Sequence, residues 1–429
     1  MKVYKFGGAS INSIERFKNT AEIIKVENNN LIIVVSAMGK ITNSLEKVAE
    51  AFYEQRNEDA LKLFEKIKEH HLNLVKYLIT KNWKETEDRL KDIFTEVEWL
   101  LHDKPVRNFN YYYDQIVGTG ELMSSTIFKF YLQETGINSE WIDIRDVIRT
   151  DNNFRGGQVQ HNATLEKINQ IILPSLEKYR IIVTQGFIGS TDENETTTLG
   201  REGSDYSAAI LAAGVNAESL TIWKDVDAVM NADPRTFKES VIIPFLSYTE
   251  VIEMAYYGAQ VIHPKTIKPL QNKNIPLFVK SFLDIDLPGT VINNDTQKKL
   301  PSIIIFKEDQ ALISFKSIDF SFVEGRPATA LNEILNDLKI KTNLSQHTAI
   351  SYLICVDDQQ DKIEDLALKA SSLFDVSVEK NLQLLTIRHY NNEIIEKLTL
   401  NKEIVLEQKT EQTVQFLLRN NLSHSNSAN

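Results

Sequence analysis

The chain has 429 residues, which is too long for one typical core, so two or three domains are expected. An apolar content of 42% with 25% charged residues is ordinary for a globular protein, and the formal net charge of −11 disfavours a nucleic-acid-binding surface. No apolar stretch approaches the length of a membrane span, and no basic-then-apolar leader precedes the first strand. The single cysteine, Cys355, lies in an apolar run, so we expect a reduced core thiol in a cytoplasmic protein.

The first predicted element is a strand that runs into a glycine-rich turn. Val3-Tyr4 is followed by Lys5-Phe-Gly7-Gly8-Ala-Ser10. Paired glycines let the backbone approach an anion without an intervening side chain, and Lys5 adds a compact positive charge. A second strand, Leu31 to Val35, leads into Ser36-Ala-Met-Gly-Lys-Ile-Thr42-Asn43.

A charge-rich helical pattern occupies the next part of the chain. Between residues 43 and 103 apolar residues recur at spacings of three and four, which predicts an insertion of two or three antiparallel helices. His70 and His71 lie within it. No partner follows them at metal-ligand spacing, so we interpret both as residues of a solvated helix face.

The middle of the chain alternates short β-rich runs with helices from Trp141 to about Pro288. This alternation predicts a mostly parallel sheet covered on both faces. Gly118-Thr-Gly-Glu121 precedes a helix, and Gln185-Gly-Phe187-Ile-Gly189 follows the strand Ile181 to Thr184. Turns at the carboxyl ends of parallel strands are where open α/β sheets bind ligands.

A second glycine-rich segment, Thr198-Leu-Gly-Arg201-Glu-Gly-Ser204-Asp205, leads into an apolar helical pattern. It presents a guanidinium and a hydroxyl at a helix N-terminus, which attracts phosphate or carboxylate. Considered alone, each glycine-rich segment also fits an ordinary turn, and Ser204-Asp205 also fits a helix N-cap. No Walker A sequence is present.

A polar, turn-rich stretch from Leu287 to Lys299 predicts a domain boundary, with a catalytic domain over residues 1–292. Beyond it, residues 303–380 have the pattern βαββαβ, a ferredoxin-like order. Residues 381–420 form a shorter unit of strand, helix and hairpin, and residues 421–429 are polar and predicted to be disordered.

Seven motifs together resemble one enzyme family. They are KFGGAS, SAMGKITN, GTGEL, QGFIGS, TLGREGSD, KDVDAVMNADPR and GAQVIHPKT. They occur in the order and spacing of aspartate kinases, members of the amino acid kinase superfamily. The resemblance implies a parallel sheet sandwiched by helices, followed by ACT modules, which commonly bind amino acids at a subunit interface.

The implied reaction is transfer of the γ-phosphoryl group of ATP, with Mg²⁺, to the β-carboxylate of L-aspartate. The product would be 4-phospho-L-aspartate, at the entry to lysine, threonine and methionine synthesis. We expect a homodimer formed through the ACT modules, with lysine or threonine as the possible effector. Because no GxGxxG fingerprint occurs, we also expect no fused dehydrogenase activity.

The resemblance also assigns residue roles. Lys5 is the catalytic cation and Asp205 orients it; the implied aspartate-binding residues are Thr42, Glu121, Phe187, Arg201 and Ser204. The implied ATP-binding residues are Lys5, Gly7, Gly8, Ser10, Lys224, Asp225, Met230, Arg235 and Gln260. No dedicated metal ligand is expected, since the phosphates would hold most of the Mg²⁺ coordination.

Four positions depart from many relatives. Lys224, Met230, Glu202 and Gln260 stand where Thr, Tyr, Gly and Lys are common. We expect Glu202 to point outward, and Lys224 could replace the charge that is missing at Gln260.

Three alternatives remain open. Glutamate 5-kinase and N-acetylglutamate kinase share the glycine-rich start, but neither normally combines this helical insertion with ACT modules. The changes at Glu202 and Gln260 also fit a weakly active protein that senses an amino acid. Because the second ACT-like unit is truncated, we expect the ACT region to serve dimerisation first, with weak or absent effector binding.

Overall fold

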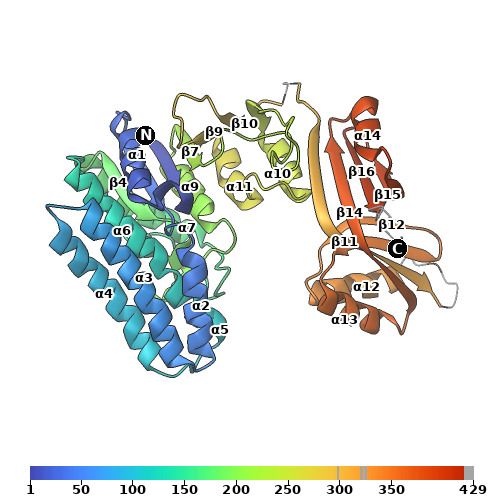
Figure 1. The fold of residues 1–429 in the computed structure, drawn as a ribbon, viewed down its shortest axis with the longest axis horizontal. Helices are drawn as coiled ribbons and strands as arrows, with labels where there is room; N and C mark the ends of the chain where they lie inside the picture. Colours follow the sequence, from blue (N-terminus) through green and yellow to red (C-terminus); the bar gives the residue numbers. More distant parts are fainter. Residues whose placement is uncertain (297–298, 319–321, 323–325, 420–429) are drawn as a thin grey trace, which may run out of the picture. The chain divides into compact units, whose positions relative to one another are not determined.

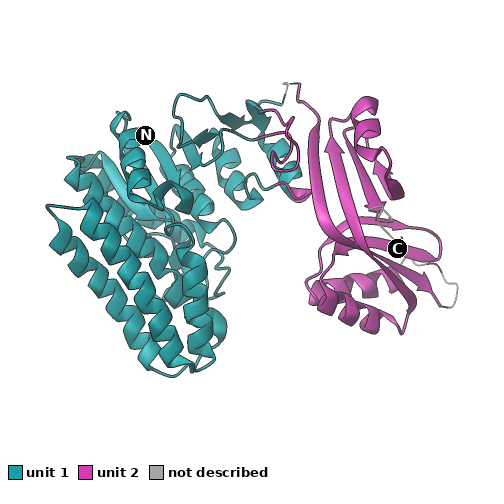
Figure 2. Ribbon diagram, in the orientation of Figure 1, with its two compact units in different colours: residues 1–229, 242–255, 260–298 teal, residues 230–241, 256–259, 299–429 magenta. Residues whose placement is uncertain are grey.

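The computed structural model describes residues 1–296, 299–318, 322 and 326–419, so the predicted tail at 421–429 lies outside the described residues. The chain forms two compact units (Figure 2). The first contains residues 1–229, 242–255 and 260–298, and the second contains 230–241, 256–259 and the chain from 299 onward. The main division therefore lies within the polar stretch from Leu287 to Lys299, but sequence reasoning did not anticipate the two short segments that belong to the second unit.

The first unit is built on an eight-stranded sheet of order β3-β4-β2-β1-β7-β9-β10-β8 (Figure 1). All neighbours are parallel except β9 and β10, which confirms the predicted mostly parallel sheet. Its strands are β1 (Lys2–Phe6), β2 (Leu31–Val35), β3 (Glu140–Trp141), β4 (Ile181–Gln185), β7 (Ser219–Lys224), β8 (Phe245–Ser247), β9 (Leu277–Ser281) and β10 (Thr290–Asn293). A separate hairpin pairs β5 (Ile188–Ser190) with β6 (Thr196–Thr198).

Helices cover both faces of this sheet. Tyr4 and Phe6 join the core formed with α1, α6 and the helical insertion, and alternation along β1 turns Val3 to the other face, where α9 packs on β1, β2 and β7. The helices are α1 (Ile14–Lys25), α2 (Ile41–Tyr53), α3 (Asn57–Leu78), α4 (Trp83–His102), α5 (Phe109–Val117), α6 (Thr119–Glu134), α7 (His161–Lys167), α8 (Leu173–Lys178), α9 (Gly203–Gly214), α10 (Tyr248–Tyr256) and α11 (Pro264–Lys273). Shorter turns are η1 (Gly8–Ile11), η2 (Ile144–Asp146) and the π-helical η3 (Ile168–Ile172). Among the described residues, none of the helices combines the length and the apolar character needed to cross a bilayer.

The helical insertion consists of α2, α3 and α4, as the three-and-four spacing predicts. The interpretation of its histidines is half wrong. His70 is exposed, whereas His71 is fully buried, and its Nδ1 lies 2.7 Å from the carbonyl oxygen of Ile67. His71 falls on the same helical stripe as buried Ile67 and Val75, and this burial lowers its pKa to about 4.

The second unit has one six-stranded antiparallel sheet of order β12-β13-β11-β14-β16-β15. The element order matches the predicted βαββαβ followed by helix and hairpin. Its elements are β11 (Ile303–Ser317), α12 (Arg326–Asp337), β12 (Thr342–His347), β13 (Ser351–Asp357), α13 (Gln360–Ala370), β14 (Phe374–Arg388), α14 (Asn392–Thr399), β15 (Glu403–Lys409) and β16 (Thr413–Arg419).

The two modules of this unit share their central strands. β11 and β14 are 15 residues long each and pair along both modules, so the expected boundary at residues 380 and 381 falls inside β14. Ile313 packs in the core with α12 and α13, while its neighbour Leu312 joins buried Cys355 in a cluster on the opposite face. The buried free thiol agrees with the expectation for Cys355.

The short segments 230–241 and 256–259 pack within the second unit. The side-chain amide of Asn231 donates to the carbonyl oxygen of Ser302 at 2.9 Å, and Phe237 stacks on Phe306 with ring centroids 5.4 Å apart. Lys341 Nζ donates to the carbonyl oxygen of Tyr256 at 3.2 Å. These contacts explain why part of the KDVDAVMNADPR motif belongs to the second unit.

Candidate active site

A cleft of about 640 Å³ opens at the carboxyl ends of β1, β2, β4 and β7. Parallel pairing of these strands brings the turns that follow them to one edge of the sheet. Twelve of the residues assigned from sequence line the cleft: Lys5, Gly7, Gly8, Ser10, Thr42, Glu121, Phe187, Arg201, Ser204, Asp205, Lys224 and Asp225.

Lys5 forms the central ion pair of the cleft. Its Nζ lies 2.7 Å from Oδ1 of Asp205, and the two side chains are 12% and 5% exposed. Lys5 comes from β1, and Asp205 comes from the first turn of α9. Because the pair is nearly desolvated, the carboxylate fixes where the ammonium charge lies.

The turns after β1 and β2 lie directly against each other. The N–H of Gly39 donates to the carbonyl oxygen of Gly8 at 3.0 Å. A Cβ on Gly8 would lie 2.7 Å from the carbonyl oxygen of Ala37, so no other residue fits there without backbone movement. Glycine at position 8 is thus required by close backbone approach, which keeps the floor of the cleft free of side chains.

Glu121 places a carboxyl group deep in the cleft, in the first turn of α6. Its Oε1 accepts the N–H of Ala37 at 3.1 Å, and its buried Oε2 has no hydrogen-bond partner among the described residues. Burial raises the pKa of Glu121 to about 8, although the Ala37 N–H and the charge of Lys5 oppose the shift. The group is therefore ready to ionise when a cation arrives beside it.

The turn before α9 has left-handed backbone at Gly200 (φ 75°) and at Glu202 (φ 54°). Arg201, between them, is exposed at the cleft. Glu202 occupies the N-cap position without a side-chain cap, so Ser204 and Asp205 lie inside the helix rather than capping it.

The expectation that Glu202 points outward is wrong. Its Oε2 accepts the backbone N–H of His263 at 2.8 Å, one residue before α11 begins. The side chain is half-buried and lines the cleft. The extra carboxylate is used to satisfy an N–H at a helix start, where negative charge is favoured.

Lys224 lies near the position of the missing lysine. Its Nζ donates to the carbonyl oxygen of Val261 at 2.8 Å, next to Gln260 in the chain. Gln260 is exposed and is not among the lining residues of the cleft. Met230 and Arg235 belong to the second unit, where Arg235 pairs with Asp233 at 2.7 Å. Nucleotide-binding roles for these residues stay predictions.

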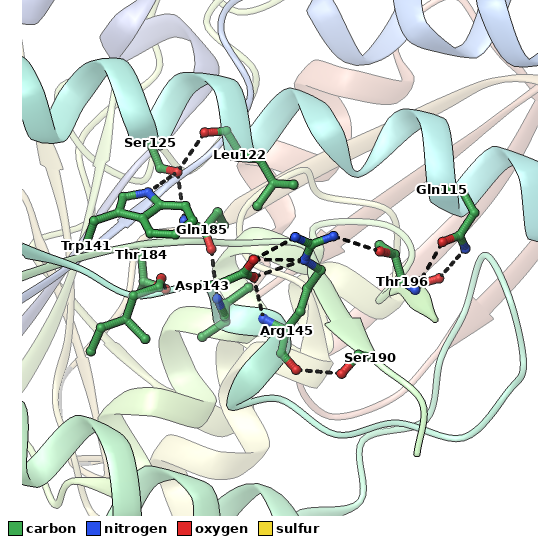
Figure 3. A network of polar contacts seen from close by, with 12 residues as sticks. Gln115, Leu122, Ser125, Trp141, Asp143, Arg145, Thr184, Gln185, Ser190 and Thr196 are labelled. Atoms are coloured by element: carbon green, nitrogen blue, oxygen red, sulfur yellow. Dashed lines mark hydrogen bonds and ion pairs between the residues drawn. The ribbon is translucent and has the colours of Figure 1, made fainter. Parts of the chain in front are cut away.

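A polar network links the end of β4 to α6, β3 and η2 (Figure 3). Gln185, the last residue of β4, accepts the N–H of Ile144 at 2.8 Å and donates to Ser125 Oγ at 2.8 Å. Trp141 also donates to Ser125 Oγ, at 3.0 Å. Because Ser125 is one turn after Glu121 on α6, the network joins the helix that carries Glu121 to the strand that precedes Phe187.

The same network reaches the β5-β6 hairpin through Arg145. This side chain pairs with Asp143 at 2.7 Å and donates to Thr196 Oγ1 at 3.2 Å (Figure 3). Its effect is to hold the hairpin beside β4.

Sequence reasoning missed several residues of the cleft wall. Tyr113, Arg155, Thr198, Trp223 and Phe282 line it, and none was assigned a role. The sequence offers one signal for Tyr113, the aromatic run Tyr111-Tyr112-Tyr113, which does not by itself indicate a site. Arg155 and Phe187 join Glu202 as non-glycine residues with positive φ around the cleft, a kind of strain that collects at functional sites.

Comparison with known proteins decides the family. The model of the amino acid kinase family matches residues 1–281, which is most of the chain. The chain belongs to the amino acid kinase family. Within it, the resemblance to aspartate kinases is confirmed by the relatives and structures that follow.

The chain is 29% identical over 410 residues to lysine-sensitive aspartokinase 3 of Escherichia coli, covering 94% of this chain and 89% of that protein. It is 34% identical over 299 residues to the bifunctional aspartokinase/homoserine dehydrogenase 2 of Arabidopsis thaliana, covering 68% of this chain but only 32% of that longer protein. Among solved structures, E. coli aspartokinase III in complex with aspartate and ADP matches with a TM-score of 0.81 at 28% identity, covering 98% of this chain and 96% of that chain.

Proposed function

We propose that this amino acid kinase family member transfers the γ-phosphoryl group of ATP to the β-carboxylate of L-aspartate, forming 4-phospho-L-aspartate. The observation that carries the proposal is one cleft that holds a half-buried ammonium, a buried carboxyl and an exposed guanidinium, from Lys5, Glu121 and Arg201. These charges complement the three charged groups of aspartate. The similarity to E. coli aspartokinase III, solved with aspartate and ADP, supports the same assignment.

Each group has a distinct role in the proposed reaction. Glu121 binds the substrate ammonium, Arg201 binds the α-carboxylate with a planar fork, and Lys5 neutralises charge between the β-carboxylate and the γ-phosphoryl group. A β-carboxylate oxygen bonds to the γ-phosphorus while the bond from that phosphorus to the bridging oxygen breaks, and ADP leaves. Because the nucleophile is already an anion, no general base is required.

Mg²⁺ would be held mainly by the phosphates and would neutralise their charge. The described part of the chain contains no cluster of three or more Asp, Glu, His or Cys side chains that could hold a metal ion. Asp225 is the exposed carboxylate of the cleft, since Asp205 pairs with Lys5 and Glu202 with His263 N–H. It fits a minor role beside the phosphates.

The reaction is tested by measuring ADP release and acyl-hydroxamate formation with MgATP and each of three substrates: L-aspartate, L-glutamate and N-acetyl-L-glutamate. We expect turnover with aspartate only. Turnover with glutamate or its acetyl derivative would favour the corresponding alternative kinase, and binding of an amino acid without turnover would favour the sensor. A single activity, the synthesis pathway and a cytoplasmic location stay predictions.

Arg201→Lys is expected to raise KM for aspartate about tenfold and to change KM for ATP less than twofold. The substitution keeps the positive charge but loses the bidentate fork that matches a carboxylate. Paired saturation kinetics on the two substrates provide the measurement. A larger rise in KM for ATP would move Arg201 to the nucleotide side of the cleft.

We expect lysine and threonine to inhibit weakly or not at all. The described second module ends with the β15-β16 hairpin, and both modules share one sheet, so the unit differs from two complete ACT modules. In the first module, the segment Lys341 to His347, where the family resemblance implies effector contact, contains the edge strand β12 (Thr342–His347). The region is proposed to serve homodimer formation first.

Calorimetric titration of the full chain with lysine and threonine, singly and together, tests this expectation. E. coli aspartokinase III, which has also been solved with lysine and aspartate, provides the positive control. A micromolar dissociation constant together with loss of kinase activity would show a working allosteric site instead.

A further inference from the structure

Arg155 is a second exposed guanidinium on the wall of the cleft. It lies in the loop between η2 and α7, with a φ of 66°, in the left-handed region that arginine rarely adopts. Such a conformation persists where surrounding contacts determine it. The contacts around Arg155 are specific.

The backbone of Arg155 is held by a buried carboxyl group. Its N–H donates to Oδ2 of Asp114 at 2.9 Å. The same carboxyl accepts the N–H of Thr198 at 2.9 Å and the hydroxyl of Thr198 at 2.7 Å. Asp114 therefore joins the Arg155 loop to the end of β6, just before the turn that carries Arg201.

The loops of Arg155 and Arg201 also touch directly. The carbonyl oxygen of Arg155 lies 3.3 Å from the point that a Cβ on Gly200 would occupy. Gly200 immediately precedes Arg201 and has positive φ. The two loops that carry Arg155 and Arg201 therefore lie at the same end of the cleft.

The guanidinium of Arg155 is oriented by aromatic rings. It lies 4.2 Å from the centroid of Tyr113 and 5.6 Å from that of Phe109. Stacking fixes the plane of a guanidinium while its N–H donors stay available at the edge. None of the ion pairs found among the described residues involves Arg155.

Arg107 is a natural comparison. Its guanidinium also stacks on aromatic rings, 3.9 Å from Tyr111 and 5.7 Å from Phe154, but it pairs with Glu195 and does not line the cleft. Arg155 has the same stacking and faces the cleft, but it forms no ion pair in the described part of the chain, although its charge is near enough to the buried Asp114 carboxyl to oppose the rise in the pKa of that group. The missing partner is what a bound anion would supply.

We propose that Arg155 determines specificity by binding, together with Arg201, the α-carboxylate of the amino-acid substrate. The inference rests on the proposed function, because it assigns a ligand group within that site. A second guanidinium at this end would select amino acids that carry a free α-carboxylate beside the reacting side chain. It would also offset the net charge of −11, which repels anions from the molecule as a whole.

Arg155→Gly is the variant of choice, since glycine adopts positive φ without strain and the loop can keep its course. We expect KM for aspartate to rise about tenfold, with kcat and KM for ATP changed less than threefold. Arg107→Ala, which removes a stacked guanidinium outside the cleft, should leave KM for aspartate unchanged. Equal KM values for aspartate in wild type and Arg155→Gly would overturn the proposal.

L-Aspartic acid α-amide tests which carboxylate is bound, because it keeps the β-carboxylate and removes the α-charge. The preference of the wild type for aspartate over this amide should shrink about tenfold in Arg155→Gly, and an unchanged preference would contradict the assignment. Calorimetric dissociation constants for aspartate separate this inference from the proposed function. Wild-type protein that binds aspartate without releasing ADP would refute the reaction, whereas weaker binding by Arg155→Gly would still support Arg155.

Discussion

Lys5→Ala is expected to lower kcat at least ~100-fold while the protein stays folded. The substitution removes a charge that is nearly desolvated and held by Asp205 at 2.7 Å, at the point where the proposed transition state gains negative charge. An ammonium fixed in this way requires no reorganisation during the reaction, which is why its removal should affect kcat more than either KM. Steady-state kinetics with both substrates, together with circular dichroism of the variant, provide the measurement.

Lys2→Ala is the matched control for this experiment. Lys2 lies on the same strand and also forms an ion pair, with Glu27 at 2.9 Å, but it does not line the cleft. Its removal should leave kcat within about twofold. Retention of more than half the activity in folded Lys5→Ala would show that the lysine is structural.

The sequence predicted the parts of the site that are built from glycine turns. KFGGAS, SAMGKITN and TLGREGSD each follow or precede an element with a clear apolar pattern, and parallel pairing then brings them together without further information. Gly8 shows why such motifs can be recognised in a sequence: the backbone of Ala37 lies so close that only glycine fits at this position. The mostly parallel character of the sheet and the order of elements in the second unit could be predicted from the apolar patterns of their strands and helices.

Other features could not be predicted because they depend on contacts between distant segments. Arg155 lines the cleft in a loop whose backbone N–H is bound by Asp114, and neither residue belongs to one of the seven motifs. The partner of Glu202 is a backbone N–H 61 positions further along the chain, so no neighbouring residue in the sequence indicates this hydrogen bond. Histidine is a polar residue that is common at surface positions, but His71 lies on the buried face of α3. Strand β14 passes through an expected domain boundary since nothing local distinguishes one long strand from two short ones.

Aspartate binding is expected to release a proton from Glu121 near neutral pH. Burial raises the pKa of this carboxyl to about 8 in the free protein, so at pH 7 it is mostly neutral. The substrate ammonium favours the carboxylate and thus lowers the pKa in the complex. The association constant for aspartate should therefore rise as pH increases from about 6 toward 8, and it should level off above that pH.

Glu121→Gln should remove this dependence and weaken aspartate binding at least tenfold at pH 8, because a neutral amide cannot pair with the ammonium.

The same substitution should also change how the stability of the free protein depends on pH. A carboxyl whose folded pKa lies above its unfolded value of 4.5 makes the free protein lose stability as pH rises from about 4.5 to 8. The glutamine variant should lack that loss, so urea unfolding would show its relative stability increasing over the same range.

Calorimetry in two buffers of different ionisation enthalpy measures the released proton directly. The substrate amine is the same in every titration, so its own ionisation cancels between wild type and variant.

Two control variants change other carboxyl groups near the cleft. Glu46→Gln changes a half-buried group that accepts the Tyr113 hydroxyl at 2.7 Å outside the cleft, and it should keep the full proton release. Asp114→Asn removes a group whose pKa burial raises to about 6, and because Asp114 also holds the Arg155 loop, this variant should bind aspartate more weakly at every pH while keeping the proton release of Glu121 near pH 8. Proton release that persists unchanged in Glu121→Gln would show that another group takes up the substrate's charge, and the assignment of Glu121 to the ammonium would then be wrong.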